Sequence, residues 1–260
     1  MKLDVYFVDA FTDNIFSGNP AAVIFTDLDD QSFMQRIAAE NNLSETAFVN
    51  LSKNQNTIRW FSPIKEVDLC GHATLASAFI YFNFLNKNAN SISFKSASGE
   101  LIVYKKDKFL QLDFPKDEYI QTNDVKTLAS AVGIAPLETY KGIINLMAVY
   151  ESEEEIYKLS PDFDKVNDLD GQGLIVTAPG SNCDFVSRYF CPKYGINEDP
   201  VTGSAHTTLI PFWSERLNKI NLHAKQLSKR GGDLFCENKE ARVLIGGQSV
   251  LYMKGVIDLN

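Results

Sequence analysis

The sequence predicts a mixed α/β (α+β) fold with two pseudo-symmetric domains, each a barrel-like, mostly antiparallel or mixed sheet around a central helix. Three observations support this prediction: a repeated phrase, a helix that is apolar on nearly every side, and many short strands. The repeat comprises Arg59-Trp60-Phe61-Ser62-Pro63 and Arg188-Tyr189-Phe190-Cys191-Pro192. Each copy precedes an acidic stretch that leads to a glycine, at Gly71 and Gly203. Such duplication indicates two similar domains, and ligands commonly bind in the cleft between them.

The first half of the chain alternates runs of β-branched and aromatic residues with turn residues, which is typical of strands. Acidic residues then open an amphipathic helical stretch. The expected elements, in chain order, are strands over 3–11 and 21–25, a helix over 29–40, and strands over 45–51 and 57–61.

Residues 71–84 form the predicted central helix. Its side chains are apolar nearly all round, so it must be surrounded by protein rather than lie on a surface. Short strands are expected next at 91–94, 101–104 and 109–114. A sheet wrapped around the helix accounts for both features.

Residues 115–118 are expected to form a linker, which places one domain at 1–115 and the other at 116–249. The closing strand, about 250–260, could complete the first domain. The second half repeats the plan with a helix near 125–132 and strands near 143–150 and 174–178. A further helix should begin at Gly203, and Pro211 should bend it or end its first segment.

Charge and composition exclude several classes of function. The 260 residues carry a formal net charge of −8, which argues against nucleic-acid partners and anionic membrane surfaces. Residues 1–9 contain acids where a signal peptide needs an apolar run, and no stretch is long enough to span a membrane. We therefore expect a cytoplasmic protein.

The sequence gives no sign of a metal or a cofactor. The four cysteines and three histidines have no metal-ligand spacing, and no glycine loop has a phosphate-binding frame. We expect neither group in the reaction. Cys70 corresponds in the repeat to Thr202, and a hydroxyl is too weak an acid for the symmetric two-thiol chemistry of some racemases.

Two predicted helix starts are candidate binding sites. Gly71-His72 and Gly203-Ser204 each place free backbone N–H groups at the positive end of a helix dipole, which favours an anion. If the two termini face each other, they form a clamp for a carboxylate. The alternative is purely structural: Asp68, Asp199 and Ser204 would only cap their helices.

Glu45 is the candidate acid/base. In a strand, Glu45 shares a face with Ala47, Val49 and Leu51, and desolvation on an apolar face raises the pKa of a carboxyl group. The alternative is a strand-entry acid that points to solvent. His72 could titrate or could hydrogen-bond locally, and His206 is expected to be structural.

These residues resemble the phenazine-biosynthesis (PhzF-like) family, whose members are related to diaminopimelate epimerase. The matching phrases are Val8-Asp9-Ala10-Phe11, Gly18-Asn19-Pro20-Ala21-Ala22-Val23, Leu43-Ser44-Glu45-Thr46-Ala47-Phe48, Gly71-His72-Ala73-Thr74-Leu75 and Glu198-Asp199-Pro200-Val201-Thr202-Gly203-Ser204-Ala205. The resemblance implies two pseudo-symmetric domains with the active site between them, homodimers, and cofactor-free proton transfer at carbon. It implies that Glu45 is the catalytic acid/base, with Asp199 and His72 as further catalytic residues. It implies substrate contacts from Asn19, Gly71, Gly203 and Ser204.

The leading hypothesis is therefore an isomerase that moves a proton between carbons of a small carboxylate-bearing metabolite. An epimerase or racemase that pairs Glu45 with Asp199 or the Cys70 thiol is the alternative enzyme. A non-catalytic metabolite-binding protein is the third reading. A family resemblance does not fix the substrate.

Overall fold

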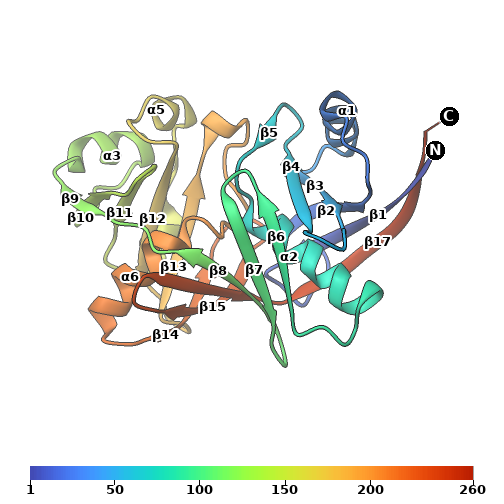
Figure 1. Ribbon diagram of the computed structural model, residues 1–260. Helices are drawn as coiled ribbons and strands as arrows, with labels where there is room; N and C mark the ends of the chain where they lie inside the picture. The colour runs from blue at the N-terminus through green and yellow to red at the C-terminus, as the bar shows by residue number, and fades with distance from the viewer. Residues whose placement is uncertain (260) are drawn as a thin grey trace. The chain divides into compact units, whose positions relative to one another are not determined.

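The computed structural model describes residues 1–259, and the chain divides into two compact units. The first unit joins residues 1–113 to the closing segment that begins at Gly246. The second unit comprises residues 114–245. Figure 1 labels the elements of both units.

The first unit contains strands joined mostly in antiparallel pairs. Its strands are β1 (Lys2–Ala10), β2 (Asn19–Phe25), β3 (Glu45–Asn50), β4 (Thr57–Phe61), β5 (Glu66–Val67), β6 (Ser91–Ser96), β7 (Gly99–Lys105), β8 (Leu110–Pro115) and β17 (Ser249–Asp258), and its helices are α1 (Gln31–Asn41) and α2 (Gly71–Ile80), the latter continued by a π-helical turn, Tyr81–Leu85. The pairing runs β17–β1–β2 antiparallel, β2–β3 parallel, β3–β4 antiparallel, β4–β6 parallel and β6–β7–β8 antiparallel.

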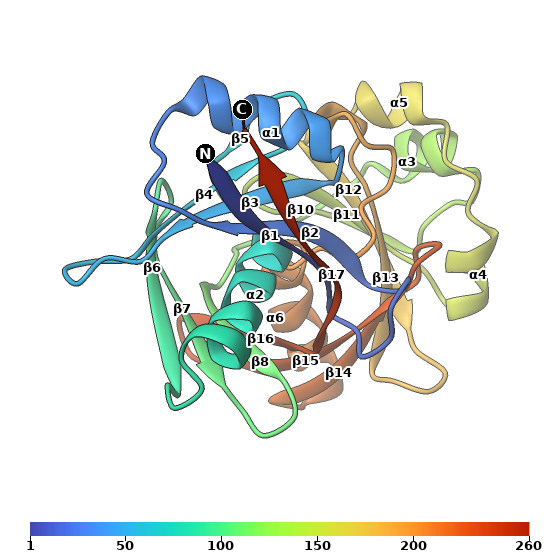
Figure 2. The same ribbon diagram turned by 90° about the vertical axis from the view of Figure 1, so that its right-hand side faces the viewer.

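The two helices of this unit pack on opposite faces of the sheet (Figure 2). Helix α1 contacts β3 and β4, and its apolar face joins Leu3, Val5, Ile24 and Phe48 in one buried cluster. Asp30 caps its start by accepting a hydrogen bond from the N–H of Phe33. Helix α2 contacts β1, β2, β3 and β17. It packs on the other face of the sheet, where every second side chain of each strand points.

Helix α2 is buried on nearly every side, as its apolar composition predicts. Only Phe79 within Gly71–Ile80 is partly exposed. Its two hydroxyl side chains remain satisfied inside the helix, because Thr74 and Ser77 donate to the carbonyl oxygens of Cys70 and Ala73. No polar group on the helix therefore has to reach water.

The second unit repeats this order of pairing. Its strands are β9 (Ile120–Thr122), β10 (Glu138–Lys141), β11 (Asn145–Val149), β12 (Gly173–Pro179), β13 (Phe185–Phe190), β14 (Asn221–Gln226), β15 (Gly232–Asn238) and β16 (Arg242–Gly247), and its helices are α3 (Val125–Val132), α4 (Glu153–Lys158), α5 (Phe163–Asn167), a 3₁₀ turn Pro192–Tyr194, and α6 (His206–Leu217). The pairing runs β9–β10–β11 antiparallel, β11–β12 parallel, β12–β13 antiparallel, β13–β14 parallel and β14–β15 antiparallel.

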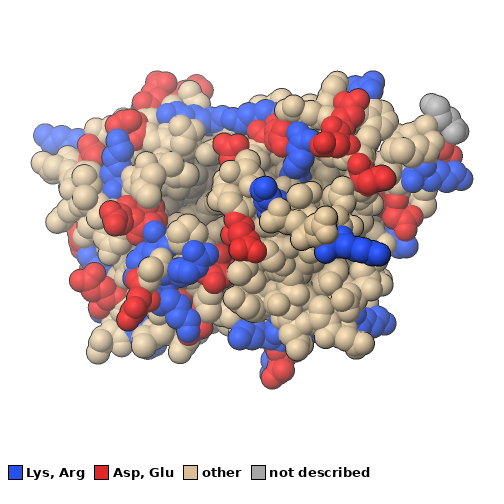
Figure 3. Space-filling view, viewed as in Figure 1, with Lys and Arg blue, Asp and Glu red and all other residues tan. Residues whose placement is uncertain are grey.

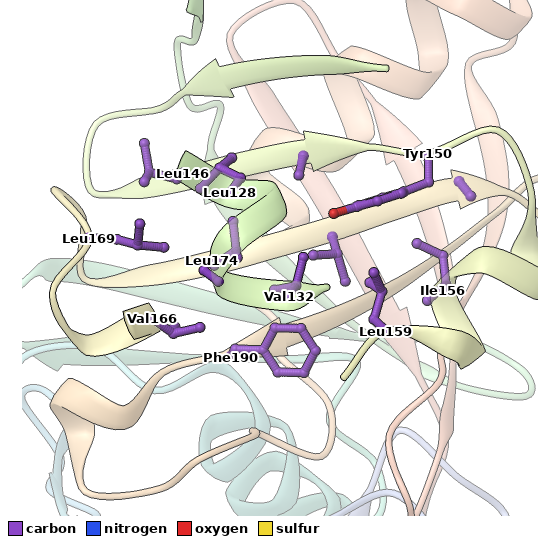
Figure 4. Close-up of a cluster of buried hydrophobic side chains, with 14 of the residues drawn as sticks. Leu128, Val132, Leu146, Tyr150, Ile156, Leu159, Val166, Leu169, Leu174 and Phe190 are labelled. Atoms are coloured by element: carbon purple, nitrogen blue, oxygen red, sulfur yellow. The ribbon is translucent and has the colours of Figure 1, made fainter. Parts of the chain in front are cut away.

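The core of the second unit lies between this sheet and the short helices α3, α4 and α5 (Figure 4). Leu128 and Val132 come from α3, Ile156 from α4, and Leu174 and Phe190 from the strands. The opposite face of the sheet meets α6, where the Trp213 indole N–H donates to the Thr177 hydroxyl at 2.9 Å. Both faces are thus buried, which explains the long apolar runs of β11 and β12.

The repeated phrases form the same local structure in both units. Arg59 holds Glu66 through two hydrogen bonds of 2.7 and 2.8 Å, and Arg188 holds Glu198 through two of 2.8 and 3.0 Å. Each guanidinium also lies over a phenylalanine two residues later, at 5.2 Å from the Phe61 ring centroid and 4.8 Å from the Phe190 one. The predicted mixed α/β fold class is confirmed.

Two expectations about the second half are wrong. Helix α6 begins at His206 rather than Gly203, because the N–H groups of His206, Thr207 and Thr208 each donate three residues back and form a 3₁₀ turn first. The second is that Pro211 would end the first helical segment: it lies inside α6, and the helix continues through the buried Phe212 and Trp213, while the expected bend at Pro211 stays a prediction.

The expected linker, residues 115–118, makes defined contacts with the second unit. Asp117 is buried, and its carboxylate accepts hydrogen bonds from the Thr208 hydroxyl at 2.6 Å and the Ile143 N–H at 3.2 Å. This segment is therefore fixed to the second unit by a polar side chain.

The surface carries charges of both signs. On the face shown in Figure 3, Lys and Arg side chains are interspersed with Asp and Glu side chains. None of the helices in residues 1–259 has the length and apolar character needed to cross a membrane.

Candidate functional site

Glu45 opens β3 and points to the α2 side of the sheet. It pairs with Ala21 of the parallel strand β2, and the strand period places it on the same face as the buried Ala47 and Val49. Its side chain is 17% exposed. The solvent-pointing alternative for Glu45 therefore does not describe this structure.

His72 lies beside Glu45, in the first turn of α2. The distance from His72 Nε2 to Glu45 Oε2 is 3.2 Å, and the imidazole is 5% exposed. Complete desolvation lowers the pKa of His72 to about 3, so the ring is neutral at physiological pH. A neutral ring carries one N–H, and its proximity to a carboxylate places that proton on Nε2.

Asn19 and Cys70 occupy the other side of the ring. The Asn19 amide nitrogen lies 3.1 Å from His72 Nδ1, so it donates to the nitrogen that carries no proton. Asn19 is fully buried at the start of β2. The Cys70 sulfur lies 3.5 Å from Nδ1 and 4.0 Å from Nε2. The ring is thus held at both nitrogens.

The start of α2 carries no side-chain cap from Cys70 or Asp68. Cys70 is the N-cap residue, and its side chain makes no capping hydrogen bond. Asp68, the capping alternative, is exposed, and only its carbonyl takes part, accepting from the Ser98 hydroxyl at 2.8 Å. The N–H groups of Gly71 and the residues after it lack intrahelical partners, as at every helix start.

The second candidate cluster precedes α6 in the second unit. The buried Asp199 carboxylate accepts a hydrogen bond from the Thr202 hydroxyl. Gly203 is buried and Ser204 is partly exposed, and their carbonyl oxygens accept the N–H groups of His206 and Thr207. Asp199 and Ser204 are not the α6 caps, because the N-cap residue is Ala205.

Gln226 organises this cluster, and sequence reasoning missed it. Its amide oxygen accepts the Thr202 N–H at 2.9 Å, and its amide nitrogen donates to the Asp199 carbonyl at 2.8 Å and the Thr202 hydroxyl at 3.1 Å. Gln226 ends β14, far from Thr202 in sequence, and no motif marks it.

His206 also supports the turn, as expected of a structural residue. Its Nδ1 donates to the Thr202 carbonyl at 2.8 Å, and its ring lies 5.9 Å from that of Phe185. Burial lowers the pKa of His206 to about 4. A neutral ring with the proton on Nδ1 satisfies the geometry.

The structure thus brings the predicted residues together in two groups. Glu45, His72, Asn19 and Gly71 form one group in the first unit. Asp199, Gly203 and Ser204 lie on one loop of the second unit.

The first group offers an oriented base. The neutral His72 ring donates to one carboxylate oxygen of Glu45, which orients the carboxylate. The same region could hold a cation, because one donor atom each from Glu45, Cys70 and His72 lie within 4.8 Å of one another. The sequence spacing gave no sign of this cluster, since Glu45 is distant from the other two.

Known proteins with similar sequences and structures match the whole length of the chain. Residues 8–255 match the family model described as phenazine biosynthesis-like protein. A Pseudomonas aeruginosa protein named as an uncharacterized isomerase is 46% identical over 262 residues, covering 100% of both chains. The crystal structure of a PhzF-family phenazine biosynthesis protein from Enterococcus faecalis superimposes with a TM-score of 0.96 at 48% identity, covering 100% of both chains.

A more distant neighbour shows the fold alone. A hydroxyproline epimerase from Agrobacterium vitis, solved with bound trans-4-hydroxy-L-proline, has a TM-score of 0.60 at 6% identity, with 98% of this chain and 92% of the other covered. The names of relatives that are 46% identical support an isomerase in general terms. Because the family model matches nearly the whole chain and full-length relatives are 46% identical to it, the chain belongs to the phenazine biosynthesis-like protein family.

Proposed function

We propose that the protein is a cofactor-independent isomerase that moves a proton between carbons of a small carboxylate-bearing substrate, with Glu45 as general acid/base. One observation carries the proposal: the Glu45 carboxylate, 17% exposed, lies 3.2 Å from Nε2 of a buried, neutral imidazole. A carboxylate that is largely desolvated and oriented by a neutral imidazole is suited to accept and return a proton.

In the proposed reaction His72 orients Glu45 and the helix start binds charge. His72 keeps one carboxylate oxygen in place while the other removes a proton from a substrate carbon and returns it to another carbon of the same π system. The N–H groups at the start of α2, around Gly71, would stabilise the negative charge that develops on the substrate. No external proton donor is needed for a net 1,3-shift.

Asp199, Gly203 and Ser204 complete the proposal. We assign Asp199 to substrate orientation or proton relay, and the backbone of Gly203 and Ser204 to binding of the substrate carboxylate. The buried hydrogen bonds from Thr202 and Gln226 support this assignment, because they fix the loop that carries these groups. The expectation that substrate lies between the two domains belongs to this proposal.

The epimerase alternative is weakened in one of its two forms. A base and an acid on opposite faces of one carbon must be about 6–7 Å apart, because each lies about 3–3.5 Å from that carbon. The donor atoms of Glu45 and Cys70 lie within 4.8 Å of each other, so in this conformation the pair is too close to flank a carbon. An epimerase would then have to pair Glu45 with Asp199.

A variant of Glu45 tests the proposed mechanism. A panel of unsaturated and 2-amino carboxylates is first screened by thermal shift, and each stabilising compound is incubated with enzyme in deuterium oxide. Mass spectrometry and ultraviolet absorbance then detect a product of unchanged composition. We expect Glu45→Gln to lower kcat by about 10²–10⁴-fold while keeping the thermal shift, because the amide cannot accept the proton.

The matched control is Glu66→Gln, which removes another partly buried carboxylate, the partner of Arg59. This variant should turn over substrate like the parent. Turnover at the parent rate in Glu45→Gln would exclude the assigned mechanism, and exchange of an α-proton without a change in absorbance would identify the epimerase instead.

A further inference from the structure

We propose that Glu45, Cys70 and His72 form a binding site for a thiophilic divalent cation such as Zn²⁺. The three residues supply carboxylate, thiolate and imidazole ligands, which are those that zinc prefers in proteins. The site is built from two elements, since Glu45 opens β3 and the other two residues begin α2.

The donor atoms are already close to the spacing of a zinc site. His72 Nε2 lies 3.2 Å from Glu45 Oε2 and 4.0 Å from Cys70 Sγ, and all three donors lie within 4.8 Å. Metal–ligand distances of about 2.0–2.3 Å in tetrahedral geometry separate neighbouring donors by roughly 3.3–3.8 Å. The Cys70 sulfur, which lies 3.5 Å from Nδ1 and 4.0 Å from Nε2, has to turn toward Nε2 by a side-chain rotation, and the three ligands then leave a fourth position open.

Charge balance favours the bound ion. Binding replaces the Cys70 S–H bond with an S–Zn bond, and the thiol proton leaves to solvent. The two positive charges of the ion are then matched by one thiolate and one carboxylate, with the imidazole neutral. A cluster of zero net charge can remain buried without a large desolvation penalty, whereas the two anions alone could not.

Asn19 supplies the outer support that such a histidine needs. A metal-bound imidazole usually donates its other N–H to a neighbouring group. The Asn19 carboxamide lies 3.1 Å from His72 Nδ1 and can present its oxygen instead of its nitrogen after a rotation about its terminal bond. The His72 tautomer with the proton on Nδ1 then leaves Nε2 free for the metal.

An occupied site would inhibit the enzyme, because a metal ion bound to the Glu45 carboxylate would prevent that carboxylate from accepting a proton. This consequence rests on the proposed function, whereas metal binding itself does not.

Cobalt substitution tests binding without any substrate. Metal-free protein is titrated with Co²⁺, and a one-to-one complex should show the near-ultraviolet absorption of a cobalt–thiolate bond, which Zn²⁺ then removes by displacement. Calorimetry with Zn²⁺ in two buffers of different ionisation enthalpy should show proton release on binding.

Single variants identify the ligands. Cys70→Ser should abolish the thiolate band, and Glu45→Gln should lower Zn²⁺ affinity by more than about tenfold. Cys183→Ser is the matched control, because Cys183 is the partly exposed thiol elsewhere in the chain, and it should keep both the band and the affinity. Circular dichroism checks that each variant is folded.

The proposal is overturned if no one-to-one complex forms, if the band persists in Cys70→Ser, or if Cys183→Ser removes it. Should Cys70→Ser fail to fold, an unchanged Zn²⁺ affinity in Glu45→Gln overturns it equally. Loss of turnover in Glu45→Gln together with absent metal binding would refute this site and leave the proposed function intact.

Discussion

His72 and His206 both remain neutral at physiological pH, because each ring is buried where the imidazolium ion would be desolvated. Their single protons are placed differently. His72 donates from Nε2 to a carboxylate, and His206 donates from Nδ1 to a backbone carbonyl. The same residue type therefore contacts a candidate base in one unit and supports a loop in the other.

The low pKa of His206 makes stability depend on pH. The folded state keeps His206 neutral down to about pH 4, whereas the unfolded chain binds a proton near pH 6.5. The unfolded state therefore gains protons first as pH falls, and stability should decline by about 1.4 kcal/mol per pH unit between roughly pH 6 and pH 4 for this residue alone.

Urea unfolding at several pH values, with a chelator present, measures this slope. His206→Gln should reduce the dependence of the unfolding free energy on pH by the contribution of one proton, about 1.4 kcal/mol per pH unit. It should also lower the stability at pH 7, because the hydrogen bond to Thr202 is lost. An identical slope in parent and variant would mean that His206 becomes protonated in the folded state.

Sequence reasoning placed Glu45 because the strand period is local information. The alternation of Glu45 with Ala47 and Val49 fixes the face on which its side chain lies. The contact with His72 depends on how α2 crosses the sheet, which no local pattern encodes. The catalytic roles of Glu45, His72 and Asp199 and the binding roles of Asn19, Gly71, Gly203 and Ser204 stay predictions.

At the scale of elements, helix α2 is almost completely buried: nine of its ten residues are shielded from solvent. Leu75 is fully buried, while Leu85, at the end of the same helical segment, is 46% exposed. Truncation of a buried leucine removes its transfer free energy and leaves a cavity that rigid neighbours fill poorly.

We therefore expect Leu75→Ala to lower the free energy of unfolding by about 2–5 kcal/mol. Leu85→Ala, the control in the same segment, should change it by less than about 0.5 kcal/mol. Urea denaturation monitored by circular dichroism provides both values. Equal effects of the two changes would contradict the view that α2 is enclosed by its own unit.

Helices with a clear pattern of apolar residues can be predicted from the sequence, whereas very short helices cannot. The helix expected at 125–132 matches α3, and the apolar character of residues 71–84 predicted a buried helix. Helices α4 and α5 are only 6 and 5 residues long, and their tertiary packing rather than their own propensity holds them. The late start of α6 has the same cause, because the turn over residues 203–205 is shaped by the distant Gln226 through Thr202.

At the scale of the whole molecule, the duplication explains why one arginine motif occurs twice. In both units an arginine on a strand binds a glutamate. That glutamate is the strand partner of the phenylalanine that follows the arginine by two residues: Glu66 pairs with Phe61, and Glu198 pairs with Phe190. The two copies have since acquired different surroundings. Arg59 is 29% exposed and reaches Asp29, which is 88% exposed, whereas Arg188 is 15% exposed.

Arg188 has a second task that Arg59 lacks. Its Nη1 donates to the carbonyl oxygens of Ile156 and Leu159, at 3.1 and 3.4 Å, where α4 ends. These carbonyls have no partners inside the helix, so the guanidinium caps α4 while its other nitrogens hold Glu198. A lysine cannot reproduce this fork, because its ammonium is a single point of contact.

The two copies should therefore respond differently to the same change. Arg188→Lys should destabilise the protein by about 2–4 kcal/mol, since buried carbonyl and carboxylate oxygens lose their donors. Arg59→Lys should cost about 1 kcal/mol or less, because Arg59 is itself 29% exposed and its second partner, Asp29, is 88% exposed, so that water can replace lost contacts. Chemical denaturation supplies both values, and the difference should survive in high salt, where exposed ion pairs are screened. Equal losses for the two variants would mean that α4 does not depend on Arg188, and that the copies have stayed equivalent in energy as well as in geometry.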